Sequence, residues 1–526
     1  MTYASSVSSN EAKTQPKETV SQRLKKMRDP GRPQIRIAID GADDSWVMTY
    51  STFDKIEGKV FITCPHKTTV DSLQIDFVGT AKTFVEKLST STAVSGKSEA
   101  FHQFLKLSQP IQHSAWPAGG VLEANKTYEF KFLFIIPEQL LPRICRHNVS
   151  SSTVQQEHLT LPPSFGDQSI SGRGNTLLDD FAPNMARIKY AITVALQEAD
   201  TNGPLGEPVT KVKKVRILPA IDEKPPLSVE GPDSDYRLRS EKDIRKGVFK
   251  GKLGSLIMEA AQPRAMRVPS YKSEQTSPDS TVVTVNLRFD PADDKARPPK
   301  LGNLQTKLKV ASFYSSAARS RLPTKKDMIW DFTQGVHAET ISLNSRCMSN
   351  VDWDFHDHRD TSRPGSPERR SSTLSESSLT GEVPEPSAKY QGKGFYTAQI
   401  LVPISLPDNK VWIPTFHTCL ISRTYGVNMH LGLTSGNMGG IDLKIPVQIS
   451  SEGNPAAVTQ HRDSMEEQAY EAMDADDFFA PRTMSPIDGQ YVGRSSLSGL
   501  MNGGTTDLPP EYDAFPRAGS RIPVAV

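Results

Sequence analysis

Apolar side chains alternate with polar ones in several short stretches of the first 220 residues. Alternation puts the apolar residues on one face of an extended chain, which is typical of a half-buried β-strand. No stretch shows the 3.6-residue period of a helix, and Gly, Pro and Asn separate them. The apolar positions are Val60, Ile62, Cys64, Leu73, Ile75, Phe77, Tyr128, Phe130, Phe132, Phe134, Ile188, Tyr190, Ile192 and Val194, with a last segment at 212–217. We predict an antiparallel β-sandwich over residues 34–218.

A second series of alternating stretches follows after residue 240. The segment 219–240 contains Pro225, Pro226 and Pro232 among several carboxylates, a composition that predicts an extended linker. The apolar positions beyond it are Val283, Val285, Leu287, Phe289, Tyr396, Ala398, Ile400, Val402, Ile441, Leu443, Ile445, Val447 and Ile449. The pattern predicts a second sandwich over 241–450, so the predicted class is all-β.

Three segments lack the apolar residues that a packed core needs. They are the N-terminal arm 1–33, a Ser- and Pro-rich insertion at about 359–392 in the second sandwich, and the tail 451–526. We predict disorder in all three. The tail holds 12 carboxylates, five arginines and no lysine, a net charge of −7, so the remainder of the +2 chain carries +9.

The cysteine spacing and the N-terminal sequence bear on location. The four cysteines, Cys64, Cys145, Cys347 and Cys419, lie far apart and form no CxxC pair, which signals neither a disulfide framework nor a zinc ribbon. The N-terminus is polar and has no apolar core of a signal peptide, and no apolar run approaches the length that spans a bilayer. We predict a cytoplasmic protein.

Motifs for catalysis or cofactor binding are not found. The sequence contains no GxSxG, GxxxxGK[ST] or HExxH motif, so the prediction is a protein that is not an enzyme and uses no cofactor. One group resembles metal chemistry because alternate residues of a strand share a face: Asp352, Asp354, His356, His358 and Asp360. The alternative is a solvated polar strand end, which we favour, so no metal is assigned.

The informative motif is Pro509-Pro510-Glu511-Tyr512 in the polar tail. Two adjacent prolines hold the backbone near polyproline II, and a tyrosine two residues later can enter a second pocket. WW domains recognise peptides in this way. We therefore predict that Pro509, Pro510 and Tyr512 bind a WW domain.

At this point the sequence resembles the arrestin superfamily, and within it the fungal α-arrestins, also called arrestin-related trafficking adaptors. The resemblance covers roughly 34–450. It rests on the segments 56–60, 73–79, 128–137, 161–166, 186–190, 298–302, 308–314, 419–425 and 443–449.

The resemblance implies two tandem immunoglobulin-like sandwiches, of the arrestin N- and C-type, without catalytic residues. It also implies an adaptor that recruits a WW-domain HECT ubiquitin ligase to plasma-membrane transporters or receptors, binds their cytosolic tails and promotes their ubiquitination and endocytosis. Such a protein would act peripherally at the plasma membrane and endosomes. The positive charge of 1–450 would favour an anionic membrane surface, although it is equally consistent with ordinary solvation; no nucleic-acid partner is expected.

Other interpretations stay open. The same fold could serve as a scaffold in pH signalling or endosomal sorting without a ligase, and a more remote alternative is a β-sandwich enzyme or sugar-binding module. Serines in the polar segments match kinase-like patterns, and phosphorylation would add negative charge to them. The candidates are Ser366, Ser371 and Ser485, with a further Ser-Pro pair at Ser277.

Overall fold

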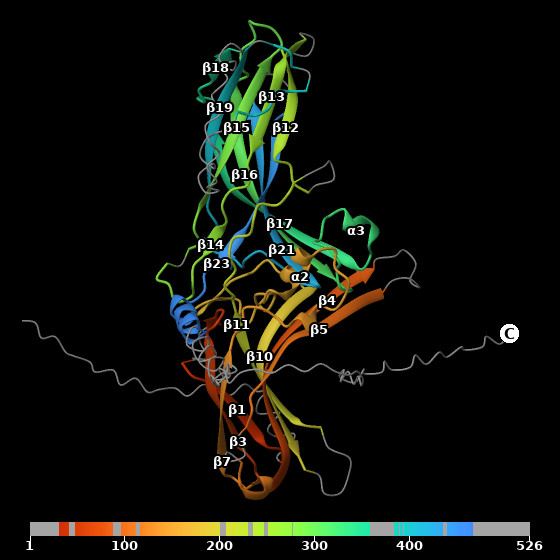
Figure 1. Ribbon diagram of the computed structural model, residues 1–526, viewed down its shortest axis with the longest axis vertical. Helices are drawn as coiled ribbons and strands as arrows, with labels where there is room; N and C mark the ends of the chain where they lie inside the picture. Colours follow the sequence, from red (N-terminus) through yellow and green to blue (C-terminus); the bar gives the residue numbers. More distant parts are fainter. Residues whose placement is uncertain are drawn as a thin grey trace, which may run out of the picture. The chain divides into compact units, whose positions relative to one another are not determined.

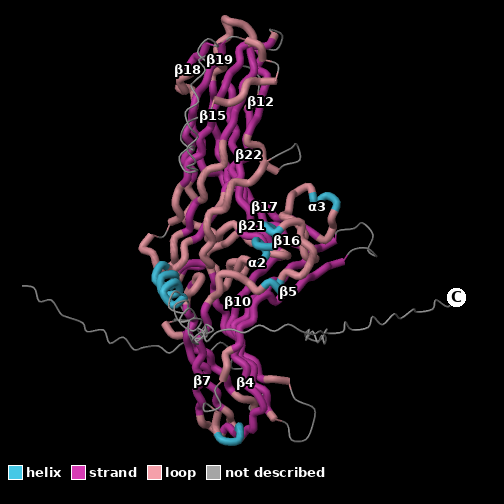
Figure 2. Tube along the Cα trace, in the orientation of Figure 1, coloured by secondary structure: helices cyan, strands magenta, loops and turns pink. Residues whose placement is uncertain are grey.

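The computed structural model describes residues 31–41, 48–87, 96–111, 116–199, 207–229, 235–246, 251–275, 277–357, 383–388, 390–392, 394–434 and 439–465. Strands make up most of them, and the helices are few and short (Figures 1 and 2). The predicted all-β class is confirmed. None of the described helices is both long and apolar enough to cross a lipid bilayer.

Two sheets form the first part of the described chain. One has the order β1-β3-β7 and the other β2-β11-β10-β4-β5, with β6 paired to β4. All these pairs are antiparallel except β2 with β11. The strands are β1 (Gln34–Ile39), β2 (Thr49–Tyr50), β3 (Lys55–Thr63), β4 (Thr68–Lys87), β5 (Gly96–Ser108), β6 (Val121–Leu122), β7 (Thr127–Ile135), β10 (Ala186–Glu198) and β11 (Val209–Ile217). A small hairpin joins β8 (Gly172–Arg173) to β9 (Thr176–Leu177).

The inward faces of these two sheets share one hydrophobic cluster. Ile188, Tyr190, Ile192 and Val194 on β10 are all fully buried, in agreement with the predicted alternation. The alternate residues of β3, β4 and β7 are buried in the same cluster. Because burial of one side chain of this size contributes about 1.5–3 kcal/mol, this alternation fixes which face of each strand turns inward.

The second part of the described chain also contains two larger sheets. Their orders are β12-β13-β15-β19-β18 and β17-β16-β21-β20, with β22 paired to β21. A parallel pair joins β14 to β23. The strands are β12 (Arg239–Arg245), β13 (Lys252–Ala260), β14 (Met266–Val268), β15 (Thr281–Pro291), β16 (Leu301–Ser315), β17 (Gln334–Cys347), β18 (Asp354–Asp357), β19 (Gly394–Ile404), β20 (Phe416–His417), β21 (Ile421–Leu433), β22 (Ile441–Val447) and β23 (Ile449–Ser451).

A second hydrophobic cluster lies between these sheets. Val283, Val285, Leu287 and Phe289 on β15 are fully buried, and the alternate residues of β19 and β22 join them. The first cluster is not confined to the first sheets, because Tyr314 and several residues between 411 and 421 belong to it. The two parts of the chain therefore share buried surface.

The structure also departs from the predicted segment boundaries. The strand β12 begins at Arg239, whereas the second region was predicted to begin at 241. The predicted linker is extended but docked, because Ile221 exchanges backbone hydrogen bonds with Ser451. In the predicted disordered insertion, Ser387 is buried, and its N–H donates to Asp290 at 2.7 Å. The prediction of disorder was wrong for this part of the insertion.

Helices account for the remaining differences. The alternation analysis missed α2 (Ser152–Leu159), whose first turn is capped because the hydroxyl of Ser151 accepts from the N–H of Val154 at 3.3 Å. Residues 455–465, at the start of the predicted disordered tail, are helical. The other short helices are α3 (Asp327–Trp330), η2 (Ala118–Gly120) and η3 (Pro142–Ile144).

Candidate functional site

A small pocket lies over the outer face of the β16 and β21 pair. The register pairs Lys309 with Gly426 and Ala311 with Thr424, so these side chains share one face of the sheet. Gly426 lets an aromatic ring come close, because a Cβ atom there would lie 3.2 Å from the ring of Tyr236. The cavity has a volume of about 100 Å³. The lining residues are Asp235, Tyr236, Lys309, Ala311, Phe313, Lys325, Thr424, Tyr425, Gly426, Asn428 and Lys444.

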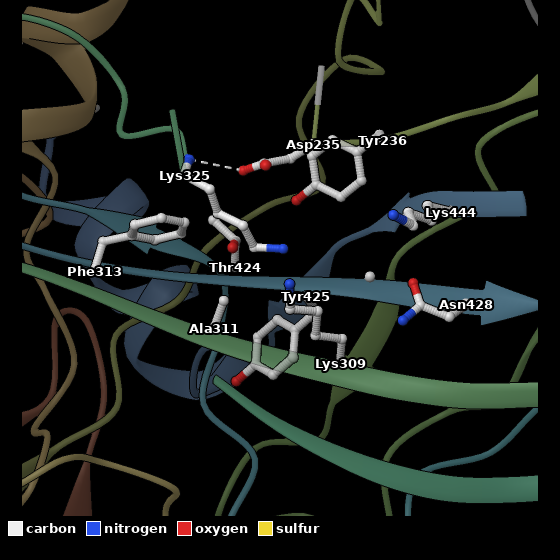
Figure 3. A pocket seen from close by; sticks show the side chains of 11 residues that line it. Asp235, Tyr236, Lys309, Ala311, Phe313, Lys325, Thr424, Tyr425, Asn428 and Lys444 are labelled. Atoms are coloured by element: carbon white, nitrogen blue, oxygen red, sulfur yellow. Dashed lines mark hydrogen bonds between the residues drawn. The ribbon is translucent and has the colours of Figure 1, made fainter. Parts of the chain in front are cut away.

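Three lysines and one carboxylate set the charge of this pocket. Figure 3 shows Lys309, Lys325 and Lys444 in the lining of the pocket, with Asp235 beside Lys325. A carboxylate oxygen of Asp235 accepts the backbone N–H of Lys325 at 3.0 Å. With three ammonium groups and one carboxylate, the lining carries a net positive charge. We call this site the lysine pocket.

Burial and neighbouring positive charges both act on the pKa of Lys309. Burial, followed by the neighbouring ammonium groups of Lys325 and Lys444, lowers this pKa from 10.5 to about 8. A bound anion would offset the repulsion and stabilise the charged form. A phosphate or carboxylate group complements the positive charge of the lysine pocket.

Polar contacts also join the first and second parts of the chain. Arg423 on β21 is fully buried, and its guanidinium donates to the carbonyl oxygen of Phe181 at 3.0 Å. It also lies 4.9 Å from the ring centroid of Phe165. Nearby, Lys410 donates to a carboxylate oxygen of Asp179 at 2.8 Å. Asp179 and Phe181 lie in one loop of the first part, between β9 and β10, whereas Phe165 lies before β8.

Asp54 is a second contact point between the two parts, and it is only 3% exposed. Its carboxylate accepts from the backbone N–H of Ser51 at 2.7 Å and from the hydroxyl of Tyr271 at 3.0 Å. The side-chain amide of Asn454 donates to it at 2.6 Å. Since Tyr271 and Asn454 belong to the second part, one buried carboxylate holds groups from both parts.

The residues predicted from the sequence as binding or modification sites lie largely beyond the described chain. Of the predicted strand-end group, His356 donates to or accepts from the hydroxyl of Thr397 at 2.7 Å and stacks on Phe395. It does not join Asp352 or Asp354 in a potential metal-binding group within the described part of the chain. The predicted residues outside that part are His358, Asp360, Ser366, Ser371, Ser485, Pro509, Pro510 and Tyr512.

The lysine pocket and the buried contacts of Asp54 and Arg423 were not predicted from the sequence. Their members come from strands and loops far apart in the chain, and single lysines on alternating strands look like ordinary solvated positions. No family model matches the chain, and no curated protein matches it either. The site must therefore be interpreted from its own chemistry.

Proposed function

We propose that this protein is an arrestin-like adaptor that brings a WW-domain HECT ubiquitin ligase to plasma-membrane transporters or receptors and promotes their ubiquitination and endocytosis. The observation that carries the proposal is Pro509-Pro510-Glu511-Tyr512 in the acidic tail. A diproline followed by tyrosine at this spacing is the ligand that WW domains bind. The surrounding sequence offers no other use for the motif.

Two immunoglobulin-like sandwiches in tandem suit such an adaptor. Each of the two hydrophobic clusters draws its main members from a pair of sheets, which is the arrangement expected of a sandwich. Buried contacts of Asp54 and Arg423 with the other part of the chain favour a body that moves as one piece. A rigid body can hold a membrane protein at one surface while the tail holds the ligase.

The lysine pocket is our candidate for contact with the membrane protein. Cytosolic tails of transporters and receptors present acidic and phosphorylated side chains, and a cavity lined by three lysines accepts such a group. The pocket would bind one charged side chain of the membrane protein, and the rest of that protein's cytosolic tail would contact the surrounding strands. Specificity for one membrane protein over another would then come from those additional contacts.

Ubiquitination would follow from proximity. A tail that holds the ligase raises the effective concentration of the ligase near the lysines of a bound membrane protein, to the millimolar range in the case of short, flexible linkers. The adaptor itself supplies no catalytic group in this mechanism. The tail contains no lysine, so the ligase is held by a segment that cannot itself accept ubiquitin on a lysine.

Binding of a fluorescent peptide covering residues 503–518 to isolated WW domains tests the proposal. We expect micromolar affinity, about −8 kcal/mol, and its loss in a Tyr512→Ala peptide. If neither peptide binds, ligase recruitment is wrong, and the scaffold in pH signalling or endosomal sorting becomes the better hypothesis. An enzyme or sugar-binding module would instead predict a polar cleft around His356, and this residue is engaged with Thr397.

A further inference from the structure

Two cysteines and two histidines from distant parts of the sequence converge at one point in the structure. The Sγ atoms of Cys145 and Cys419 and one ring nitrogen each of His147 and His158 all lie within 4.8 Å of one another. Three of the four side chains are buried, and His147 is half-buried. In the part of the chain that the structure describes, no other set of three or more Cys, His, Asp and Glu side chains is gathered closely enough to hold a metal ion.

Three separate pieces of chain bring these four residues together, because Cys145 and His147 lie only two positions apart. Cys145 follows η3, and His158 lies in the last turn of α2. Cys419 lies between β20 and β21, in the second part of the chain. Backbone hydrogen bonds also connect these pieces through the segment that contains Arg319 and Ser320. The N–H of Ser150 donates to the carbonyl oxygen of Ser320 at 2.7 Å, and the N–H of Arg319 donates to the carbonyl oxygen of Cys419 at 3.0 Å. The folded chain therefore holds the segment of Cys145 and the segment of Cys419 close together by backbone hydrogen bonds as well.

Three of the distances between sulfur and nitrogen atoms of the four groups are close to those of a tetrahedral zinc site. In such a site, Zn–S bonds of about 2.3 Å and Zn–N bonds of about 2.0–2.1 Å place sulfur and nitrogen ligands about 3.5 Å apart. Here Cys145 Sγ lies 3.2 Å from His147 Nε2 and 3.6 Å from His158 Nδ1. His147 Nε2 also lies 3.2 Å from Cys419 Sγ. Each of these three separations agrees with the tetrahedral value to within about 0.4 Å.

The imidazole of His147 is oriented for metal binding. Its Nδ1 lies 3.1 Å from the carbonyl oxygen of Asn148, and a carbonyl can only accept a hydrogen bond. The proton therefore belongs on Nδ1, and the lone pair of Nε2 points at the two sulfur atoms. A carbonyl that fixes the second nitrogen in this way is the usual partner of a zinc-bound histidine.

His158 reaches the same point from the last turn of α2. Its side chain is buried, and its Nδ1 faces Cys145 Sγ at 3.6 Å. Neutral imidazoles and thiolates are the forms in which histidine and cysteine bind a metal ion.

We propose that Cys145, His147, His158 and Cys419 bind one Zn²⁺ ion, which fastens the segment around α2 to the loop before β21. Two thiolates and two imidazoles in tetrahedral arrangement are a ligand set that selects zinc, and four protein ligands leave no position for water. Binding displaces one proton from each thiol and so releases two protons. The resulting site is electrically neutral, which makes its burial favourable.

The site has a structural role that is separate from recruitment of a ligase. His147 and Cys419 are 272 positions apart, so the ion closes a very long loop of chain. It also links the first part of the chain to the second part within the first hydrophobic cluster, to which both Cys145 and Cys419 belong. Binding energy at this point stabilises the folded state, because the unfolded chain does not preform the site.

Metal content of the purified full-length chain tests the proposal directly. Protein expressed in zinc-supplemented medium and dialysed against metal-free buffer is analysed by inductively coupled plasma mass spectrometry. We expect one zinc ion per wild-type chain and a small fraction of that in Cys419→Ser and His147→Gln. Cys347→Ser is the matched control, because this thiol is exposed and belongs to no group of ligands; it should retain one ion.

Cobalt substitution gives a second readout that does not depend on the folding of a variant. Wild-type protein loaded with Co²⁺ should show thiolate-to-cobalt charge transfer and the intense visible bands of tetrahedral cobalt. A folded wild-type chain that stays metal-free in excess Zn²⁺, or octahedral cobalt spectra, would overturn the proposal. A disulfide between Cys145 and Cys419 that persists in protein purified in reducing buffer would overturn it as well. Neither outcome bears on WW-domain binding, so the two proposals can fail separately.

Discussion

Replacement of Asp54 by alanine should destabilise the protein strongly, because it leaves three donors without their acceptor, of which Ser51 and Asn454 are buried and Tyr271 is half-buried. The donors are the backbone N–H of Ser51, the hydroxyl of Tyr271 and the amide of Asn454, at 2.6 to 3.0 Å. Burial, followed by the charge of Asp54, raises the pKa of Tyr271 well above its usual range, so its hydroxyl is a donor throughout neutral pH.

The size of this effect follows from the contacts. A hydrogen bond to a charged group contributes about 1.5–3 kcal/mol, and removing one partner from a buried polar network costs about 3–5 kcal/mol in total. We expect a loss of about 3–5 kcal/mol for Asp54→Ala, which is a large part of the 5–15 kcal/mol that is usual for a folded protein. Tyr271→Phe removes one of the three contacts and should cost about 1–2 kcal/mol.

Urea denaturation of the full chain, monitored by tryptophan fluorescence and circular dichroism, measures these differences in the free energy of unfolding. The control is Asp71→Ala, which removes an exposed carboxylate on β4 and should change the free energy of unfolding by less than about 0.5 kcal/mol. The double variant Asp54→Ala with Tyr271→Phe should show a coupling energy above about 0.5 kcal/mol. If Asp54→Ala matched Asp71→Ala, the buried carboxylate would not hold the two parts of the chain together.

Three further predictions follow from the same structure. Burial of the Asp167 carboxyl opposes its ionisation, but hydrogen bonds from Lys214 and Ser169 together with the charges of Lys189 and Lys214 outweigh this, and the pKa of Asp167 falls to about 2. The stabilising effect of Asp167 is therefore present above about pH 4 and lost between about pH 4 and 2, and Asp167→Asn should flatten that acid limb in urea titrations at stepped pH. In the lysine pocket, Lys309→Gln should reduce the increase in melting temperature that phosphopeptides cause in thermal-shift assays, whereas Lys131→Gln, at an exposed position, should not. Equal increases in the two variants would exclude the lysine pocket as the binding site for phosphopeptides. If the proposed ligase also modifies this protein, diglycine remnants on its own lysines should map within residues 1–450, and their absence there would argue against self-ubiquitination.

Much of the fold could be predicted from the sequence because its signal is local. On β3, β7, β10 and β15, alternation gave both the strand and its buried face, since the side-chain period of a strand is two residues. The helix α2 was not predicted because it is short and only Val154 and His158 are buried, which is too few to produce a helical period in the sequence. Pro384 and Ser387 looked disordered by composition, yet Arg288 and Asp290 bind their backbone.

The sites were harder to predict because their members meet only in the folded chain. Cys145 and His147 are close in sequence, and this pair was the one local signal of the four-residue cluster. His158 and Cys419 complete the cluster through tertiary packing, which no spacing rule contains. Conversely, the prediction of WW-domain binding by Pro509, Pro510 and Tyr512 needs no tertiary packing, because the motif is contiguous in the sequence.

Ubiquitinated peptides from cells that express either the wild-type chain or Tyr512→Ala test the adaptor hypothesis most directly. Quantitative diglycine proteomics of the membrane fraction would compare the two at equal adaptor levels. The account predicts that a defined set of transporters or receptors loses diglycine sites and remains longer at the plasma membrane in the variant. If no membrane protein changed although the wild-type chain bound WW domains, the proposed adaptor function would be contradicted.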